Sequence, residues 1–130
     1  GSEREAEGES MKTVIDDKAK AVAQVMTLMG QMRRGLGEAI SAAGVCDIQV
    51  ALIKYADSHK MFHQAMETWT DSQLSEYNPE VEEAMGKGGI EQFRDSGKTM
   101  DDGRAEIVRT LTSKCGCRKH QPTPWEVQSL

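Results

Sequence analysis

The chain has 130 residues, of which 28% are charged, and a net charge of −5. A chain of this length predicts a single domain. The net negative charge argues against nucleic-acid binding, because an acidic chain repels the phosphate backbone unless its basic residues are clustered. The basic clusters in this chain are small. No run of about 18 apolar residues is present, so no membrane span is predicted.

The first ten residues (GSEREAEGES) are polar and acidic and show no apolar period. Gly1-Ser2 is typical of the scar that tag removal leaves. We therefore expect residues 1–10 to be a disordered leader and Ser10 to be the N-cap of the first helix.

Residues 11–43 carry apolar side chains at alternating three- and four-residue steps, which is the period of one helix face. This first stripe consists of Val22, Val25, Met29, Met32, Leu36, Ala39 and Ala43. Gly30, Gly35 and Gly37 each cost about 1 kcal/mol relative to alanine inside a helix. Because the period crosses them without a shift, we predict one continuous helix over 11–43, with a bend or a close backbone contact at the glycines.

A short link follows, in which Gly44 suits the left-handed position after a helix and Asp47 suits the N-cap of the next. A second stripe then predicts a helix over 48–77. It consists of Ile48, Leu52, Tyr55, His59, Phe62, Met66 and Trp69. A link this short makes the two helices antiparallel neighbours, as in a coiled-coil-like hairpin. Helices of about 45 Å expose more apolar stripe than short helices can cover, so we expect the hairpin to self-associate.

The remaining chain predicts shorter helices. Asn78-Pro79 predicts a helix start, because proline suits the first helical position. We expect helix over 79–85, a break at 86–89, a helical segment over 90–94, a loop over 95–98, and a last helix over 99–113 with Thr99 as its cap. The expected buried face of the last helix is Ile107, Val108 and Leu111.

No alternating pattern predicts a strand. The fold class is therefore all-α: a long antiparallel helical hairpin with two shorter C-terminal helices, bundle-like, in one domain over 11–114. Residues 115–130 contain no period and are predicted to be a flexible tail, in which Trp125 between Pro124 and Glu126 resembles a short docking motif.

His59 and His63 are four residues apart, and Glu67 extends the row by one more turn. This spacing places both imidazoles on one helix face, where zinc or iron sites often take their ligands. The simpler interpretation is that His59 is a buried structural residue on the apolar stripe. We therefore expect no cofactor, with zinc or iron as the alternative.

The three cysteines are Cys46, Cys115 and Cys117. Two thiolates and the imidazole of His120 offer three zinc ligands in the tail. The simpler interpretation is a flexible tail with reducible thiols. An odd number of cysteines in a small chain is not typical of a disulfide framework. This predicts a reducing, cytoplasmic location.

An acidic stretch with Glu80, Glu82 and Glu83 precedes Asp101 and Asp102 by some twenty residues. Paired acidic motifs on helices can bind magnesium, so a magnesium-dependent enzyme acting on a nucleotide is a further alternative. These carboxylates are in or near first helical turns, where the helix dipole accounts for them. We find no catalytic residues.

Eight methionines and only six aromatic residues favour an adaptable interaction surface. The prediction is a non-catalytic helical module for protein–protein interaction or oligomerisation rather than an enzyme, with Met29, Met32, Trp69 and Trp125 as the interaction residues. The alternative is a small metal-binding helical bundle that uses His59 and His63.

Overall fold

The computed structural model describes the backbone of residues 2–86 and 88–113, and side chains from residue 17 onward except at 77 and 78. These residues form helices and connecting turns without a strand. The elements are α1 (Ser2–Gly44), α2 (Ile48–Asp71), the 3-10 helix η1 (Leu74–Tyr77), α3 (Asn78–Met85), α4 (Gly89–Arg94) and α5 (Ser96–Ser113). The predicted all-α fold is confirmed. No described helix is both long enough and apolar enough to cross a membrane.

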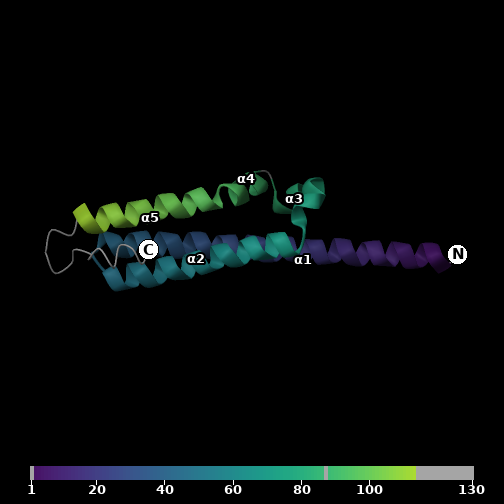
Figure 1. Ribbon diagram of the computed structural model, residues 1–130, viewed down its shortest axis with the longest axis horizontal. Helices are drawn as coiled ribbons and strands as arrows, with labels where there is room; N and C mark the ends of the chain where they lie inside the picture. Colours follow the sequence, from purple (N-terminus) through teal and green to yellow (C-terminus); the bar gives the residue numbers. More distant parts are fainter. Residues whose placement is uncertain (1, 87, 114–130) are drawn as a thin grey trace.

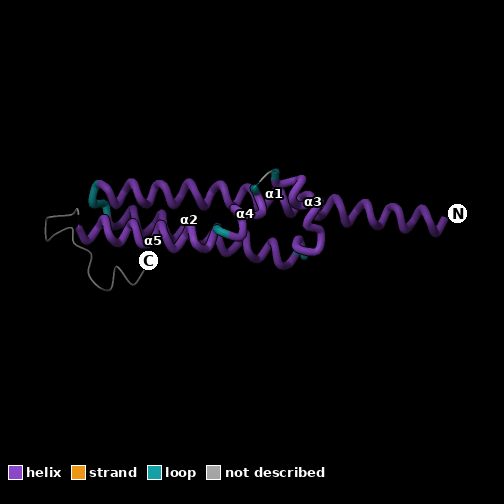
Figure 2. The backbone as a smooth tube through the Cα atoms, turned by 90° about the horizontal axis from the view of Figure 1, so that it is seen from above, coloured by secondary structure: helices purple, strands orange, loops and turns teal. Residues whose placement is uncertain are grey.

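The long helices α1 and α2 form an antiparallel hairpin, and α5 lies along it (Figures 1 and 2). The chain runs in the same direction in α5 as in α1, so the C-terminal end of α5 lies at the end that holds the hairpin turn (Figure 1). The first turns of α1 extend beyond the other helices at the opposite end. We expected residues 1–10 to be disordered, but α1 begins at Ser2. This segment is rich in glutamate and also contains alanine and arginine, which are good helix formers.

The core confirms the first predicted stripe. All seven of its side chains are buried, and Val25, Met32, Ala39 and Ala43 are fully inaccessible. The helix is continuous through its glycines, as predicted. A long apolar stripe on one face is therefore a sufficient signal for α1, because that face contacts several elements along its length.

The second predicted stripe is wrong in part. Tyr55 is buried, and Phe62 and Trp69 pack against the core, but His59 is exposed. The fully buried positions of α2 include three small residues that the prediction omitted: Ala51, Ser58 and Ala65. The face of α2 toward the core is thus rotated by about one residue relative to the bulkiest stripe, because small side chains allow the helices to approach closely.

Ser58 of α2 contacts both α1 and α5. Its hydroxyl donates a hydrogen bond to the Met32 carbonyl oxygen at 2.6 Å and lies 3.4 Å from the Met100 sulfur. A Cβ at Gly35 would lie 3.3 Å from the Ser58 Cβ. Gly35 is therefore the glycine that permits a close approach, whereas a Cβ at Gly30 or Gly37 would meet nothing within 4 Å.

The helix α2 ends at Asp71, earlier than the predicted residue 77. Gln73 adopts a left-handed backbone with φ of 51°, and the chain turns so that Leu74 becomes fully buried. The Lys18 ammonium of α1 donates hydrogen bonds to the carbonyl oxygens of Ser72 and Gln73. Backbone carbonyls left without helical partners at this end thus acquire a donor from α1.

The last helix begins earlier than predicted. Only Asp95 separates α4 from α5, which starts at Ser96, so the expected loop over 95–98 is absent and Thr99 is not a cap. Thr99 lies inside the first turn and its hydroxyl donates to the Asp95 carbonyl oxygen at 3.1 Å. Ser96 is buried and donates to the Phe93 carbonyl oxygen at 2.5 Å. These local hydrogen bonds satisfy the hydroxyls of Ser96 and Thr99 in the segment that the sequence predicted to be a loop.

Candidate functional site

The hairpin turn joins α1 to α2 with the expected cap but with a different left-handed residue. The Asp47 carboxylate accepts a hydrogen bond from the Val50 amide at 3.2 Å, so this N-cap is confirmed. The left-handed residue is Cys46, with φ of 60°, whereas Gly44 belongs to α1. This turn sets the direction of α2 relative to α1. It therefore also sets which residues in the first turns of α2 are exposed.

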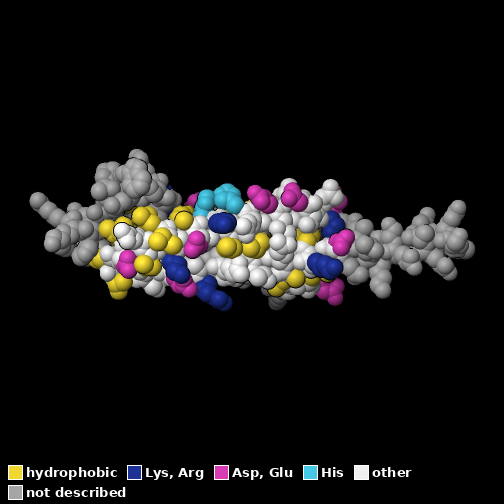
Figure 3. Space-filling model, turned by 90° about the horizontal axis from the view of Figure 1, so that it is seen from below, with side chains coloured by type: hydrophobic (Ala, Val, Ile, Leu, Met, Phe, Trp, Pro, Cys, Tyr) yellow, Lys and Arg dark blue, Asp and Glu magenta, His cyan; other side chains and the backbone are white. Residues whose placement is uncertain are grey.

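Three large apolar side chains are exposed at this end. Val45 is 77% exposed, Ile53 59% and Val50 39%. Val50 and Ile53 are three residues apart, so they share one face of α2. We call these three residues the hairpin-end surface. Figure 3 shows hydrophobic side chains gathered over the same end of the molecule. The other large apolar side chain found exposed in the described part of the chain, Met26, belongs to α1.

The sequence prediction missed the hairpin-end surface. Its signal was available, because Val50 and Ile53 are apolar residues outside the stripe that we assigned to the core. An isolated exposed apolar residue needs no explanation, whereas neighbouring exposed apolar residues that form a patch are typical of an interaction site.

Cys46 lies at the same turn and is disulfide-bonded. It is half-buried and packs against the core cluster. This disulfide does not fit the reducing location that the odd number of cysteines predicted. Cys115, Cys117 and His120, the candidate zinc ligands of the tail, lie outside the described residues, as does Trp125.

The structure brings His59 and His63 together on an exposed face of α2. Their ring centroids are 4.4 Å apart and their planes are nearly perpendicular. Two imidazoles supply half of a tetrahedral zinc shell. Within the described part of the chain, no three His, Cys, Asp or Glu side chains are grouped so that they could hold a metal ion. Glu67 is exposed and does not complete such a group with the two histidines.

The exposed position of His59 contradicts the prediction of a buried structural histidine. Partial desolvation, and then the neighbouring His63, lower the pKa of His59 below its ordinary 6.5. The unfolded state therefore binds more protons than the folded state at pH values between the folded pKa and 6.5. The contribution of His59 to stability is complete above about pH 6.5 and is lost as the pH falls toward the folded pKa.

We expect His59→Gln to reduce the loss of stability on acidification. The effect should be small, because water screens a group this exposed. Urea unfolding of wild type and variant at several pH values between about 5 and 8 measures it. Identical pH dependence in the two proteins would contradict the prediction.

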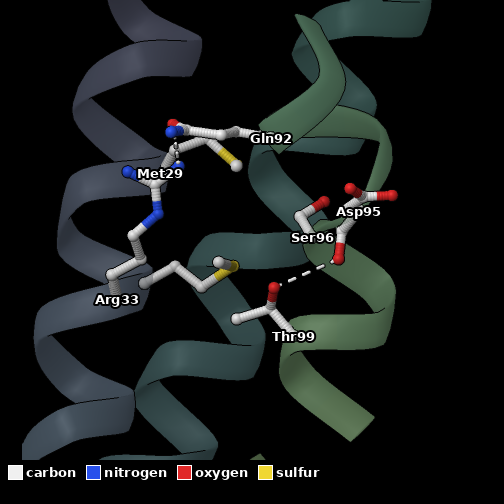
Figure 4. Close-up of a pocket in the computed structure, with 7 residues that line it drawn as sticks. Met29, Arg33, Gln92, Asp95, Ser96 and Thr99 are labelled. Atoms are coloured by element: carbon white, nitrogen blue, oxygen red, sulfur yellow. Dashed lines mark hydrogen bonds between the residues drawn. The ribbon is translucent and has the colours of Figure 1, made fainter. Parts of the chain in front are cut away.

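An open pocket of about 390 Å³ lies between α1 and the α4–α5 junction (Figure 4). Its lining residues are Met29, Met32, Arg33, Gln92, Asp95, Ser96 and Thr99. The Arg33 guanidinium donates a hydrogen bond to the Gln92 side-chain oxygen at 2.9 Å. Arg33, Ser96 and Thr99 thus make hydrogen bonds within the protein, and these seven side chains contain no nucleophile paired with a general base.

The predicted interaction residues Met29 and Met32 are 4% and 0% exposed, so they belong to the core and offer almost no surface to a partner. Trp69 is half-buried and stacks on Phe93 with ring centroids 4.1 Å apart. This contact joins α2 to α4 and gives the tryptophan a structural role. The acidic pairs Glu82-Glu83 and Asp101-Asp102 are exposed on α3 and α5.

Comparison with protein-family models, curated proteins and solved structures gave no match. The geometry of the described residues is therefore the basis for proposing a function. Of the features above, the hairpin-end surface is the one in which several large apolar side chains of the described part of the chain remain exposed to solvent.

Proposed function

We propose that this chain is a non-catalytic helical module for protein–protein interaction that self-associates through its hairpin. The observation that carries the proposal is the exposure of Val45, Val50 and Ile53 beside the turn. Removing apolar surface from water contributes roughly 25 cal/mol per Å², so burial of this group in a contact between copies is favourable.

The rest of the described chain supports this choice over catalysis. The pocket between α1, α4 and α5 contains methionine thioethers and side chains that bond to the protein itself. A magnesium-dependent reaction on a nucleotide would need carboxylates gathered around the ion. The acidic pairs on α3 and α5 are separate and exposed, which favours the interpretation that they solvate the surface.

A small metal-binding bundle is the second candidate, favoured by the 4.4 Å separation of the His59 and His63 rings. Zinc or iron would need further ligands from water, a second copy or the tail. Elemental analysis of wild type and His59→Gln distinguishes this candidate, since stoichiometric metal that disappears in the variant would support it.

The cytoplasmic location and the exclusion of nucleic acid stay predictions. The disulfide at Cys46 is an observation that favours an oxidising compartment instead. The acidic net charge of −5 continues to argue against binding to nucleic acid.

Ile53→Lys should shift the protein toward the monomer. The change places a charge in a surface that self-association would bury, where an unpaired charge is costly. The matched control is Met26→Lys, because Met26 is also exposed, at 44%, but lies outside the hairpin-end surface. Light scattering across a concentration series, in oxidising and in reducing buffer, gives the mass of each protein.

A monomeric wild type at high micromolar concentration in both buffers would overturn self-association. Equal effects of Ile53→Lys and Met26→Lys would show that copies associate through another surface.

A further inference from the structure

Two histidines lie together on a face of α2 that is separate from the hairpin-end surface. His59 and His63 are both exposed, and their ring centroids are 4.4 Å apart. Figure 3 shows histidine side chains gathered at the surface of the molecule. With about 3.6 residues per turn, the two positions lie roughly 80–120° around α2 from Ile53. The pair therefore belongs to a second surface, which the proposed contact at the hairpin end does not use.

The positions of the two rings suit a shared metal ion. Zinc binds imidazole nitrogens at about 2.0–2.1 Å, so two nitrogens of one tetrahedral shell lie about 3.3 Å apart. Residues four positions apart in a helix are neighbours on its surface, so both rings can reach a single ion. Exposed side chains change rotamer rapidly, and both nitrogens can therefore turn toward the ion without a change in the core.

The helix beneath the pair is held in place by the core. Tyr55, one turn before His59, is buried, and Phe62 packs against the core cluster. The His63 ring lies edge-on to Phe62, with ring centroids 5.5 Å apart. Sites on packed helices hold their ligands more precisely than sites on loops. The backbone at the pair therefore needs no ordering when a metal ion binds.

The pair supplies only half of a zinc shell. Structural zinc sites have four protein ligands in a tetrahedron. Among the residues that the structure describes, no third His, Cys, Asp or Glu is grouped with the pair so that it could complete the shell. A second copy of the chain carries the same two histidines, and a two-fold axis through the ion would bring four imidazoles to it. Two-fold dimers are the commonest homo-oligomers, so this is the simplest source of the missing ligands.

We propose that His59 and His63 bind zinc together with the same two residues of a second copy, so that one ion bridges two chains. Imidazole is a ligand type that suits zinc. This inference goes beyond the proposed function, because it assigns a metal site and a second, zinc-dependent contact between copies. It does not require the contact at the hairpin-end surface.

The surface beside the pair allows a second α2 to approach closely. Ala56 is exposed and lies one turn before His59 on the same face. The distance between two packed helices depends on the size of the side chains at the contact, and an alanine there permits a short distance. Leu52, one turn further back, is half-buried and offers additional apolar surface to the second copy.

The charges beside the pair offset each other. Lys60 precedes His63 by three residues and Glu67 follows it by four, and both side chains are exposed. Each is thus about one helical turn from His63. Because the ammonium and the carboxylate have opposite signs, the surroundings add little net charge to that of the ion, which is the largest local charge at such a site.

The test uses the full chain with Ile53→Lys, which removes the proposed contact at the hairpin end, and the wild type in parallel. Chelator-treated protein is titrated with zinc sulfate. Light scattering measures the mass, and calorimetry measures the bound zinc. We expect the mass of the Ile53→Lys protein to double with one zinc ion per two chains, and chelator to restore the monomer.

The ligands are tested by a second substitution in the same protein. Adding His63→Gln should abolish the doubling, and so should His59→Gln. The matched control is Lys60→Gln, an exposed neighbour on α2 that should leave the doubling intact. Zinc held elsewhere in the chain cancels in the difference between the proteins with and without His63. Circular dichroism checks that each variant is folded, and reversal by chelator tests the bridge without a histidine substitution.

A mass that does not respond to zinc would overturn the bridge. One zinc ion per chain without a change in mass would do the same. An equal response to zinc in the His63→Gln protein would show that other residues are the ligands. A wild type that is monomeric without zinc and dimeric with it would refute the proposed contact at the hairpin end and leave the zinc bridge standing.

Discussion

Phe93→Ala is expected to lower the free energy of unfolding by about 3–5 kcal/mol. Phe93 is 6% exposed and stacks on Trp69 with an angle of 19° between the rings. The variant loses buried apolar surface, leaves a cavity and removes an aromatic pair that contributes about 0.5–1.5 kcal/mol in addition. Because α4 is only six residues long, it has few other contacts to hold it against α2.

Urea unfolding followed by circular dichroism measures this loss. The control is Glu91→Ala in the same helix, an exposed position where a change within about 0.5 kcal/mol is expected. The double variant with Trp69→Ala completes a cycle. Strictly additive effects of the two truncations would show that the rings do not stabilise each other.

Gly103→Val is expected to destabilise the protein by about 1–3 kcal/mol, because the new side chain overpacks the contact between α5 and α1. A Cβ at Gly103 would lie 2.5 Å from one Leu36 methyl carbon and 2.7 Å from the other. Leu36 is itself 6% exposed, so it has little room to move. The Leu36 side chain and α5 must therefore move apart. This movement should increase amide exchange throughout α5.

Gly37→Ala is the matched control for a glycine inside a helix. A Cβ at Gly37 would meet nothing within 4 Å, so the change should stabilise α1 by up to about 1 kcal/mol through helix propensity and the entropy of the unfolded chain. Thermal unfolding of both variants makes the comparison. A Gly103→Val protein as stable as wild type would show that α5 is not packed at this glycine.

The hairpin itself was predictable because its determinants are local. The first stripe from Val22 to Ala43 is apolar at one helical period, and every member is buried. Asp47 after a short link was recognisable as a cap, and its carboxylate does accept the Val50 amide hydrogen bond. Capping and amphipathic period depend on residues within a few positions of one another, so a single sequence contains them.

The hairpin-end surface was not predictable in the same way. Val50 and Ile53 were visible as apolar residues, but their exposure follows from which face of α2 meets α1. Likewise, Cys46 could be placed at the turn, whereas no local pattern indicates that it is disulfide-bonded. Both properties depend on residues far apart in the chain.

Sequence was therefore enough for the all-α class, the continuous first helix and the antiparallel partner that follows it. Tertiary packing decided the rotation of α2, which buries Ser58 and leaves His59 exposed. The reason is that close packing between helices stabilises their contact, in addition to the burial of apolar side chains. At the contact of Gly35 with Ser58, a small polar residue whose hydroxyl finds the Met32 carbonyl fits where a larger side chain would hold the helices apart.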